Sequence, residues 1–293
     1  MSINRILALQ TLGYTQREAS FLYLVAVHSG YFLRRQFDFF IQRKKGSLSH
    51  RFTEKGRIAG HIEVIDYQGC FVHHLRFKPI YELVGSPKSQ NQVRKGDAQI
   101  RARLMTLDYV LENNTEHFLG TDQEKFDFFV TVRGVNAAIF TDTCRKLHLL
   151  LGGFPISVAD SSYPASSVVR FTFIDEGLLT VKKFGRFLTG LLPLLDALGK
   201  FEIIYVALSP ANFGAAEKVF RQVFYAHFAE RQRTFAGFPS DINAEATTNR
   251  MRLHANFSRR LLSSSYPNFF RNAPQGSVRG YNTSSIFEGA TSL

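Results

Sequence analysis

The 293-residue chain has only two cysteines, Cys70 and Cys144, and no apolar run long enough to cross a membrane. A spanning helix needs about 18–20 apolar residues. The longest apolar runs here, Phe21–Val27 and Gly190–Leu195, are far shorter. No small-residue cleavage site follows an apolar region at the N-terminus, and two cysteines are too few for a secreted disulfide scaffold. We therefore expect a soluble, cytoplasmic protein with reduced thiols and no membrane partner.

Several chemical motifs are also missing from the sequence. It contains no G-x-x-x-x-G-K-[ST] loop, no G-x-S-x-G elbow, no H-E-x-x-H helix and no evident internal repeat. His61, His73 and His74 lack cysteine or carboxylate partners at the spacing of metal ligands, so they are expected to be ordinary polar positions of a hairpin. No metal site, cofactor or nucleotide-dependent activity is predicted.

What the chain does have is an excess of positive charge and a large apolar fraction. It holds 36 Lys and Arg against 24 Asp and Glu, for a net charge of +12. Such a balance favours an anionic partner, nucleic acid first and an acidic membrane surface second. The 45% of hydrophobic residues, with 29 Phe, exclude a disordered chain. The length suggests roughly two domains.

The excess charge lies at the two ends of the chain. Residues 1–85 carry 12 basic and 6 acidic residues, and residues 221–293 carry 9 and 4. The middle is balanced, with 9 and 8 in residues 86–150 and 6 and 6 in residues 151–220. This distribution predicts a basic N-terminal domain, a neutral second domain and a basic tail. The predicted boundaries are 1–85, a polar linker over 86–99, an α/β domain over 100–228 and a largely flexible tail over 229–293.

The first 80 residues have the element order of a winged helix-turn-helix. Thr15-Gln-Arg-Glu18 is a capping box that predicts a helix from Gln16 to about His28. A short helix is expected over 31–40, a third helix from about Ser47, and a hairpin from the strands 61–66 and 70–75. Such a domain lays its third helix in the major groove and lets the hairpin touch the backbone or the minor groove. The inward residues expected on the third helix are Leu48, Phe52 and Ile58.

Eleven residues of this region are candidates for contact with double-stranded DNA. Cations on the third helix can neutralise phosphates or donate to guanine, and its small polar residues can position or read bases. Cations before it add a salt-dependent attraction without sequence preference. The candidates are Arg34, Arg35, Arg43, Lys44, Lys45, Ser47, Ser49, His50, Arg51, Lys55 and Arg57. Two alternatives stay open, namely a winged helix that binds protein and an ordinary solvated basic face.

The rest of the chain alternates strands and helices. A helix is expected over 100–112, and the capping box Thr121-Asp-Gln-Glu124 opens another that runs through Phe129. Strands are expected over 154–158, 168–174 and 201–207, with helices over 183–198 and 215–228, which is an α/β pattern. The tail is expected to be largely loose with some affinity for DNA, and residues 250–262 could form one short basic helix within it.

Acidic residues lie at the ends of two of these strands. Asp160, Asp175 and Glu176 could hold a divalent cation, as the acidic residues of restriction-endonuclease-like nucleases do. The lysine that this family places two positions after its acidic residue is absent, and Lys182 or Lys183 could replace it. Three interpretations remain: a metal-dependent nuclease, a domain of that fold without activity, and acidic residues that merely end strands and form turns.

The whole layout resembles the replication-relaxation family of bacterial plasmid and mobile-element proteins. The resemblance covers about residues 10–225 and rests on the winged helix, the polar join, the strand end Phe171-Thr-Phe-Ile-Asp-Glu-Gly177 and Ile203–Val206. It implies an α+β protein that binds DNA in plasmid replication, relaxation or transfer, with no established reaction. The alternatives are an adaptor for a relaxase or replication protein and a metal-dependent nuclease. A homodimer is also left open.

Overall fold

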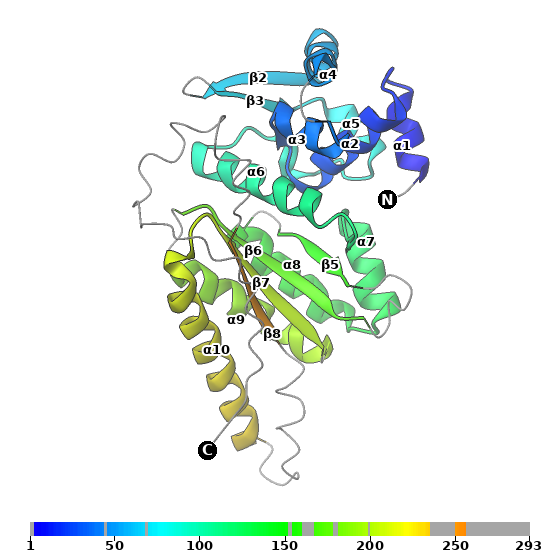
Figure 1. The fold of residues 1–293 in the computed structure, drawn as a ribbon. Helices are drawn as coiled ribbons and strands as arrows, with labels where there is room; N and C mark the ends of the chain where they lie inside the picture. Colours follow the sequence, from blue (N-terminus) through cyan, green and yellow to red (C-terminus); the bar gives the residue numbers. More distant parts are fainter. Residues whose placement is uncertain are drawn as a thin grey trace. The chain divides into compact units, whose positions relative to one another are not determined.

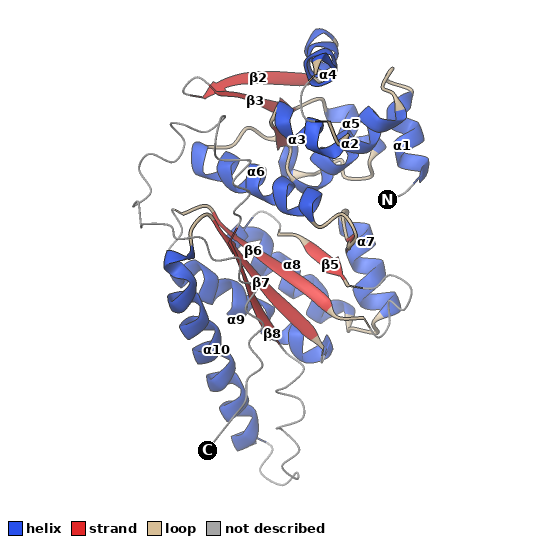
Figure 2. Ribbon diagram, in the orientation of Figure 1, coloured by secondary structure: helices blue, strands red, loops and turns tan. Residues whose placement is uncertain are grey.

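The computed structural model of the chain describes residues 3–43, 46–67, 70–151, 154–159, 167–177, 181–198, 200–234 and 250–255. They form helices and two small sheets, which confirms the mixed α+β class (Figures 1 and 2). They divide into two compact units. The first holds the residues up to Thr115 with Gly120–Glu124, and the second holds Glu116–Leu119 and the described residues from Lys125 onward. No helix in the described ranges is both long and apolar enough to span a bilayer.

The first unit surrounds a three-stranded antiparallel sheet of order β1-β3-β2. Strands β2 and β3 form the expected hairpin, whereas the short strand β1 replaces the start of the single helix that the sequence predicts over residues 31–40. In chain order the elements are α1 (Ile3–Gln10), α2 (Gln16–His28), β1 (Tyr31–Phe32), α3 (Arg34–Phe40), α4 (Ser47–Ile58), β2 (Ile62–Tyr67), β3 (Cys70–Leu75), α5 (Lys78–Leu83), η1 (Gln90–Gln92) and α6 (Asp97–Glu112).

Four phenylalanine rings form the centre of this unit. The ring of Phe21 on α2 packs edge-on against Phe32 of β1, Phe37 of α3 and Phe52 of α4, with centroids 5.4, 5.1 and 5.8 Å away. Phe37 and Phe52 stack at 4.4 Å. All four rings are buried, so one cluster fixes how three helices and a strand pack together.

Helix α3 ends in a Schellman motif. The Gln42 N–H donates to the Phe39 carbonyl at 3.0 Å and the Arg43 N–H donates to the Asp38 carbonyl at 2.9 Å. Gln42 has a positive φ of 57°, which this motif requires of the residue after the cap. The turn satisfies the last carbonyls of α3 and leads the chain toward α4.

Helix α4 begins at Ser47 as predicted, but it buries a different face. Leu48 and Ile58, which were expected inside, are exposed. Gly56 has no side chain, so Ile62 of the neighbouring strand packs directly against the helix there. The buried face consists of small polar residues around one aromatic ring, namely Ser49, Phe52, Thr53 and Gly56. Because these residues are spaced as one helix face, close packing outweighed hydrophobicity in setting the rotation.

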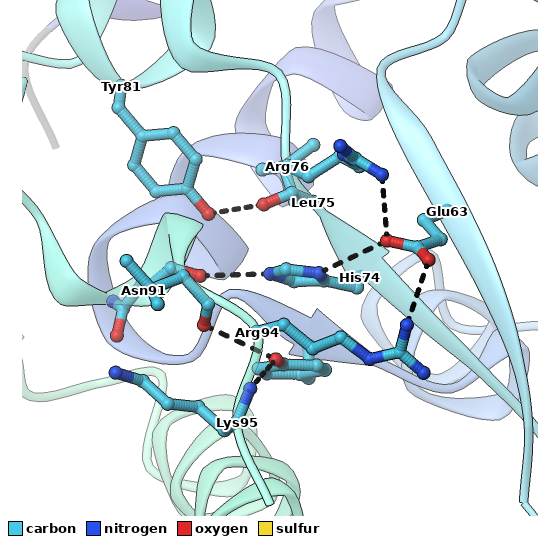
Figure 3. A network of polar contacts seen from close by, with 10 residues as sticks. Glu63, His74, Leu75, Arg76, Tyr81, Asn91, Arg94 and Lys95 are labelled. Carbon is cyan, nitrogen blue, oxygen red and sulfur yellow. Dashed lines mark hydrogen bonds and ion pairs between the residues drawn. The ribbon is translucent and has the colours of Figure 1, made fainter.

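Residues 86–99 do not form the loose linker that their composition predicted. The buried Asn91 donates from Nδ2 to the carbonyls of Ala26 and Val27, both at 3.0 Å. Its own carbonyl lies 3.3 Å from Nε2 of His74 (Figure 3). The Lys95 N–H donates to the Tyr31 hydroxyl at 2.8 Å. These bonds hold the segment against α2 and the hairpin, so it is part of the first unit.

Helix α6 also belongs to the first unit, although residues 100–112 were expected in the second domain. Gln36 donates to the Leu104 carbonyl at 2.9 Å, and the Ser29 hydroxyl donates to the Arg103 carbonyl at 2.9 Å. Ile100 and Leu104 pack with Val72 of the hairpin. The division between units therefore falls near residue 115, because α6 completes the core on the second face of the hairpin.

The second unit is a five-stranded sheet of order β4-β5-β6-β7-β8. Its first two pairs are antiparallel and its last two are parallel. Phe171, Phe173, Ile203 and Tyr205 pack against the helices in one core. The elements are β4 (His117–Phe118), α7 (Asp122–Phe126, which opens at the boundary between units), η2 (Asp127–Val132), α8 (Ala137–Leu151), β5 (Ile156–Val158), β6 (Val169–Asp175), α9 (Val181–Leu198), β7 (Phe201–Ala207), η3 (Pro210–Asn212), α10 (Phe213–Thr234) and β8 (Arg250–Ala255).

Strand β8 is a correction to the expected tail. The sequence predicts a largely flexible tail that could hold one short basic helix near residues 250–262, but Arg250–Ala255 pair with β7 as a parallel strand. The alternation of basic and apolar residues in this segment fits a strand as well as a helix. The other tail residues lie outside the described ranges, apart from the end of α10.

We predict that Gly30→Ala destabilises the protein far more than Gly60→Ala. Both glycines have a positive φ, 79° and 72°, and therefore share the backbone penalty of about 1 kcal/mol. A Cβ at Gly30 would overlap the backbone carbonyl of Asn91, whereas one at Gly60 meets open space. Urea unfolding should show an additional loss of about 2 kcal/mol at Gly30. Equal losses would contradict this account of the residue 86–99 segment.

Candidate nucleic-acid interface

The first half of α4 presents three of the predicted DNA-contacting residues to solvent. Ser47, His50 and Arg51 are exposed on consecutive turns of the helix. Arg51 Nη2 donates to Ser47 Oγ at 2.8 Å. The hydroxyl accepts from the guanidinium, and no carboxylate among the described residues pairs with Arg51, so none of them neutralises its positive charge.

Helix α3 and the following turn add two cations beside this face. Arg34 is exposed at the start of α3, and its Nη1 lies 3.5 Å from His50 Nδ1. Arg43 is exposed just after the Schellman turn. We call Arg34, Arg43, Ser47, His50 and Arg51 the α3–α4 surface. It can contact anionic groups through its three arginines and hydrogen-bonding edges through the serine and histidine.

Arg35 was predicted to contact DNA, but it is held inside the first unit. Its Nη1 and Nη2 donate to the two carboxylate oxygens of Asp108 on α6 at 3.1 and 3.0 Å. Gln36 donates to the same carboxylate at 2.7 Å. A bidentate pair with this little exposure serves to join α3 to α6. Arg35 is therefore removed from the candidate interface.

Lys55 and Ser49 are also engaged within the unit. Lys55 Nζ donates to Glu18 Oε2 at 2.6 Å and to the Gly13 carbonyl at 3.2 Å. Glu18 is at the same time the carboxylate of the capping box of α2. Ser49 is buried and its hydroxyl donates to Asp38 at 3.1 Å. Burial raises the pKa of the Asp38 carboxyl. Both predicted contacts therefore stabilise the fold.

Three further cations were predicted to contact DNA, and the structure describes one of them. Arg57 is exposed on the last turn of α4, and its Nε donates to Glu54 at 2.9 Å on the same helix. This pair cancels much of the local charge while leaving the guanidinium near solvent. Lys44 and Lys45 lie outside the described residues.

The hairpin carries an exposed apolar face that the sequence analysis did not single out. Residues 61–75 contain no lysine or arginine. Val64 and Phe71 are exposed, Phe71 to 52%, and both point to the face shared with His73 and Asp66. The pairing register could have revealed them, because alternate residues of a hairpin occupy one face. This face suits an apolar or hydrogen-bonding partner better than phosphates.

The three histidines of the hairpin region each lie in a separate aromatic stack. His61 stacks on Phe77, and its Nδ1 lies 2.8 Å from the Tyr14 hydroxyl. His73 stacks on Phe32 at 5.0 Å, and His74 on Tyr31 at 4.3 Å. Figure 3 shows the network around His74, in which Glu63 also pairs with Arg76 and Arg94 at 3.2 and 3.5 Å. The histidines thus pack and position the hairpin.

Of the acidic residues considered for a nuclease, the structure describes Asp175 and Glu176, and the Asp175 carboxylate is bound by protein groups. Asp175 is buried, and its carboxylate accepts from the Tyr205 hydroxyl at 2.5 Å, from Asn212 at 3.2 Å and from the Gly177 N–H at 2.9 Å. Glu176 is buried as well. Asp160 lies outside the described residues, and no group of three potential metal ligands occurs within them. Lys182 and Lys183 are exposed on α9.

Comparison with known proteins gives no assignment. No family model, no curated protein and no solved structure matches the chain. The candidate function therefore rests on the residues of the chain itself.

We predict that His73 makes the protein less stable in mild acid. Burial, assisted by the positive charge of Arg34, lowers the pKa of His73 from 6.5 to about 4. As pH falls below 6.5 the unfolded chain binds a proton that the folded chain excludes, so stability is lost down to about pH 4. Between pH 7.5 and 5.0, the free energy of urea unfolding should fall by about 2 kcal/mol more in the wild type than in His73→Phe. The exposed His50→Gln variant should behave as the wild type, and equal losses in all three would refute the assignment.

We also predict that Asp175 supports the sheet. Asp175→Asn should lower the free energy of unfolding by about 1–3 kcal/mol, because the Tyr205 hydroxyl loses its carboxylate acceptor. In a double-mutant cycle with Tyr205→Phe, urea unfolding should give a coupling of about 1 kcal/mol or more. Unchanged stability in Asp175→Asn, together with loss of a Mg²⁺- or Mn²⁺-dependent plasmid cleavage that the wild type performs, would instead make the carboxylate catalytic.

Proposed function

We propose that the chain is a DNA-binding protein whose first unit is a winged helix-turn-helix for double-stranded DNA. The observation that carries this proposal is the α3–α4 surface. It gathers Arg34, Arg43 and Arg51 beside Ser47 and His50 on two consecutive helices and the turn between them, with no carboxylate paired to these arginines among the described residues. Neutralising phosphates releases counterions, so such a surface gives salt-dependent affinity.

The order of elements supports the winged-helix assignment. A helix, a short strand, two helices and a hairpin follow one another, and the strands pair in the order β1-β3-β2. Helices α3 and α4 share the phenylalanine cluster, as the two helices of a helix-turn-helix share one core. In this arrangement α4 is the recognition helix, and its exposed first half faces the major groove.

Roles within the surface follow from residue chemistry. Arg51 suits bidentate contact with a guanine edge, and Ser47 and His50 suit contacts with either base or phosphate. Arg34 on α3 and Arg43 on the turn after it flank the exposed face of α4 and suit the phosphate backbone. The complex would therefore combine sequence reading by α4 with positioning by α3 and its turn.

We assign the second unit a role in assembly. Strand β5 pairs antiparallel with β4 and β6, β6 pairs parallel with β7, and α9 connects β6 to β7. This topology favours a restriction-endonuclease-like fold without activity. The carboxylate of Asp175 is already used by Tyr205 and Asn212, which speaks against a metal-dependent nuclease. The resemblance to the replication-relaxation family extends the proposal to plasmid or mobile-element replication, transfer or its regulation, in the cytoplasm.

The hairpin favours a second candidate function, that of an adaptor for a relaxase or replication protein. Val64 and Phe71 are exposed on a hairpin without cations, and Asp66 shares their face. Apolar and acidic side chains suit a protein partner better than a phosphate backbone. Co-purification with such a partner in the absence of DNA, lost in Phe71→Ser, would support the adaptor.

We predict that Arg51→Gln weakens DNA binding and makes it less sensitive to salt. Fluorescence anisotropy on a duplex, repeated over a range of salt concentrations, should show a slope of log K against log salt that is smaller in magnitude by roughly 0.9 if Arg51 contacts a phosphate. If Arg51 reads a base, affinity should instead fall by about 1–3 kcal/mol for the preferred sequence alone.

The matched control is Arg57→Gln on the same helix. Because Glu54 already neutralises Arg57, this variant should change affinity and slope less than Arg51→Gln does. Absence of wild-type binding at low salt would refute the proposed function. Equal effects of the two substitutions would show that the first half of α4 is not the centre of the DNA-binding surface.

A further inference from the structure

The second unit has a charge distribution that its composition conceals. Residues 151–220 hold six acidic and six basic residues. Three of the acidic residues, Asp175, Glu176 and Glu202, are buried at no more than 3% exposure. Two more are paired, Asp196 with His227 and Glu217 with Arg221. Four of these acidic residues are buried or paired with an arginine and contribute little negative charge to the surface. Asp196 is exposed beside His227, which is charged only when protonated.

The basic residues of the same segment are distributed in the opposite way. Only Arg170 is withdrawn, between Glu116 and Glu202 at 2.6 Å from each. The other five cations of the segment are exposed. The four that lie on helices α9 and α10 make no ion pair with any described residue. These helix residues, which we call the α9–α10 surface, are Lys182, Lys183, Arg186 and Lys218.

Helices α9 and α10 pack against each other near these cations. Lys182 and Arg186 are one turn apart on the solvent side of α9, and Gly185 lies between them in sequence. A Cβ at Gly185 would lie 3.3 Å from Val219 of α10, so the helices touch at this point, next to Lys218. The opposite side of α9 is buried in the core of the unit.

We propose that the α9–α10 surface is a second nucleic-acid contact, which binds the phosphate backbone without reading sequence. The inference rests on the proposed DNA binding and adds a site in the other unit. Three lysines and an arginine present point charges but few fixed hydrogen-bonding edges, which suits phosphates rather than bases. An amphipathic membrane contact is disfavoured, because the apolar side of α9 is already buried.

A second contact changes what the whole chain does. Two weak sites on one chain raise each other's effective concentration on a long polyanion. The total salt dependence then reflects phosphate contacts made by both units. It also gives Lys182 and Lys183 a role outside the nuclease chemistry for which the sequence suggested them, because they lie exposed and make no ion pair with any described residue.

The test compares two triple variants of the full chain that remove the same charge. K182Q/K183Q/R186Q removes three cations of the α9–α10 surface, and K78Q/K88Q/K200Q removes three exposed lysines elsewhere. On a 40-base-pair duplex, the first should lower affinity about tenfold at 0.1 M salt and reduce the magnitude of the salt slope by roughly 2–3. The second should change both much less. Circular dichroism melting checks that both variants fold, and the single substitutions of the first set provide the same reading if the triple variant does not.

The possible results distinguish failure of the α9–α10 surface from failure of the proposed function. If both triple variants behave alike while Arg51→Gln lowers affinity, the α9–α10 surface is refuted and the proposed function stands. If the wild type does not bind DNA at low salt, both fall. If K182Q/K183Q/R186Q alone keeps full DNA affinity but loses binding to an acidic peptide such as poly-glutamate, the ligand is a protein and the nucleic-acid assignment is overturned.

Discussion

The packing of four phenylalanine rings is the constraint on which the α3–α4 surface depends. Phe21 contacts the other three rings edge-on, and Phe37 and Phe52 stack between α3 and α4. Buried aromatic rings have large contact areas and strict geometric preferences, so α4 cannot rotate about its axis without breaking the cluster. The direction in which Arg51 points is thus decided in the core, by residues that would never touch a ligand.

Carboxylate neighbours decide which cations of the first unit remain free. Lys55 and Arg51 lie one turn apart on α4, yet only Lys55 has an acidic partner, Glu18. Glu18 is fixed there because it caps α2. Arg35 is engaged in the same way by Asp108 of α6. A count of basic residues therefore overstates the positive charge available on the surface. Carboxylates that cap a helix, such as Glu18, or join two helices, such as Asp108, neutralise part of it.

Local signals in the sequence predicted several elements well. Both capping boxes form, at Thr15 and at Thr121, α4 begins at Ser47, and β7 has the expected bounds. Each of these depends on residues close together in the chain. The inward face of α4 was wrong because Gly56 accepts Ile62 from another element.

Elements that depend on partners far away in the sequence were not predicted, because local patterns do not reveal such partners. The segment 86–99 looked like a linker, because its polar residues find backbone partners far away in sequence, as Asn91 does with Ala26 and Val27. Strand β8 exists through its pairing with β7, which no local pattern announces. The sequence also could not show which cations of the candidate interface are exposed and which are held in ion pairs. Arg35, for example, pairs with a carboxylate that is 73 positions away.

Buried charge has a structural use in the second unit, and this explains its basic exterior. Arg170 of β6 lies between Glu116, just before β4, and Glu202 of β7, and Ser157 of β5 donates to the same Glu116. Charged residues with so little exposure are tolerated only when paired, so the cluster fixes the register across neighbouring strands. The carboxylates used in this way, and Asp175 with them, are taken from the surface. A segment with a balanced composition is then left with exposed lysines on α9 and α10 that make no ion pair with the described residues, and its surface charge depends on which carboxylates the sheet buries.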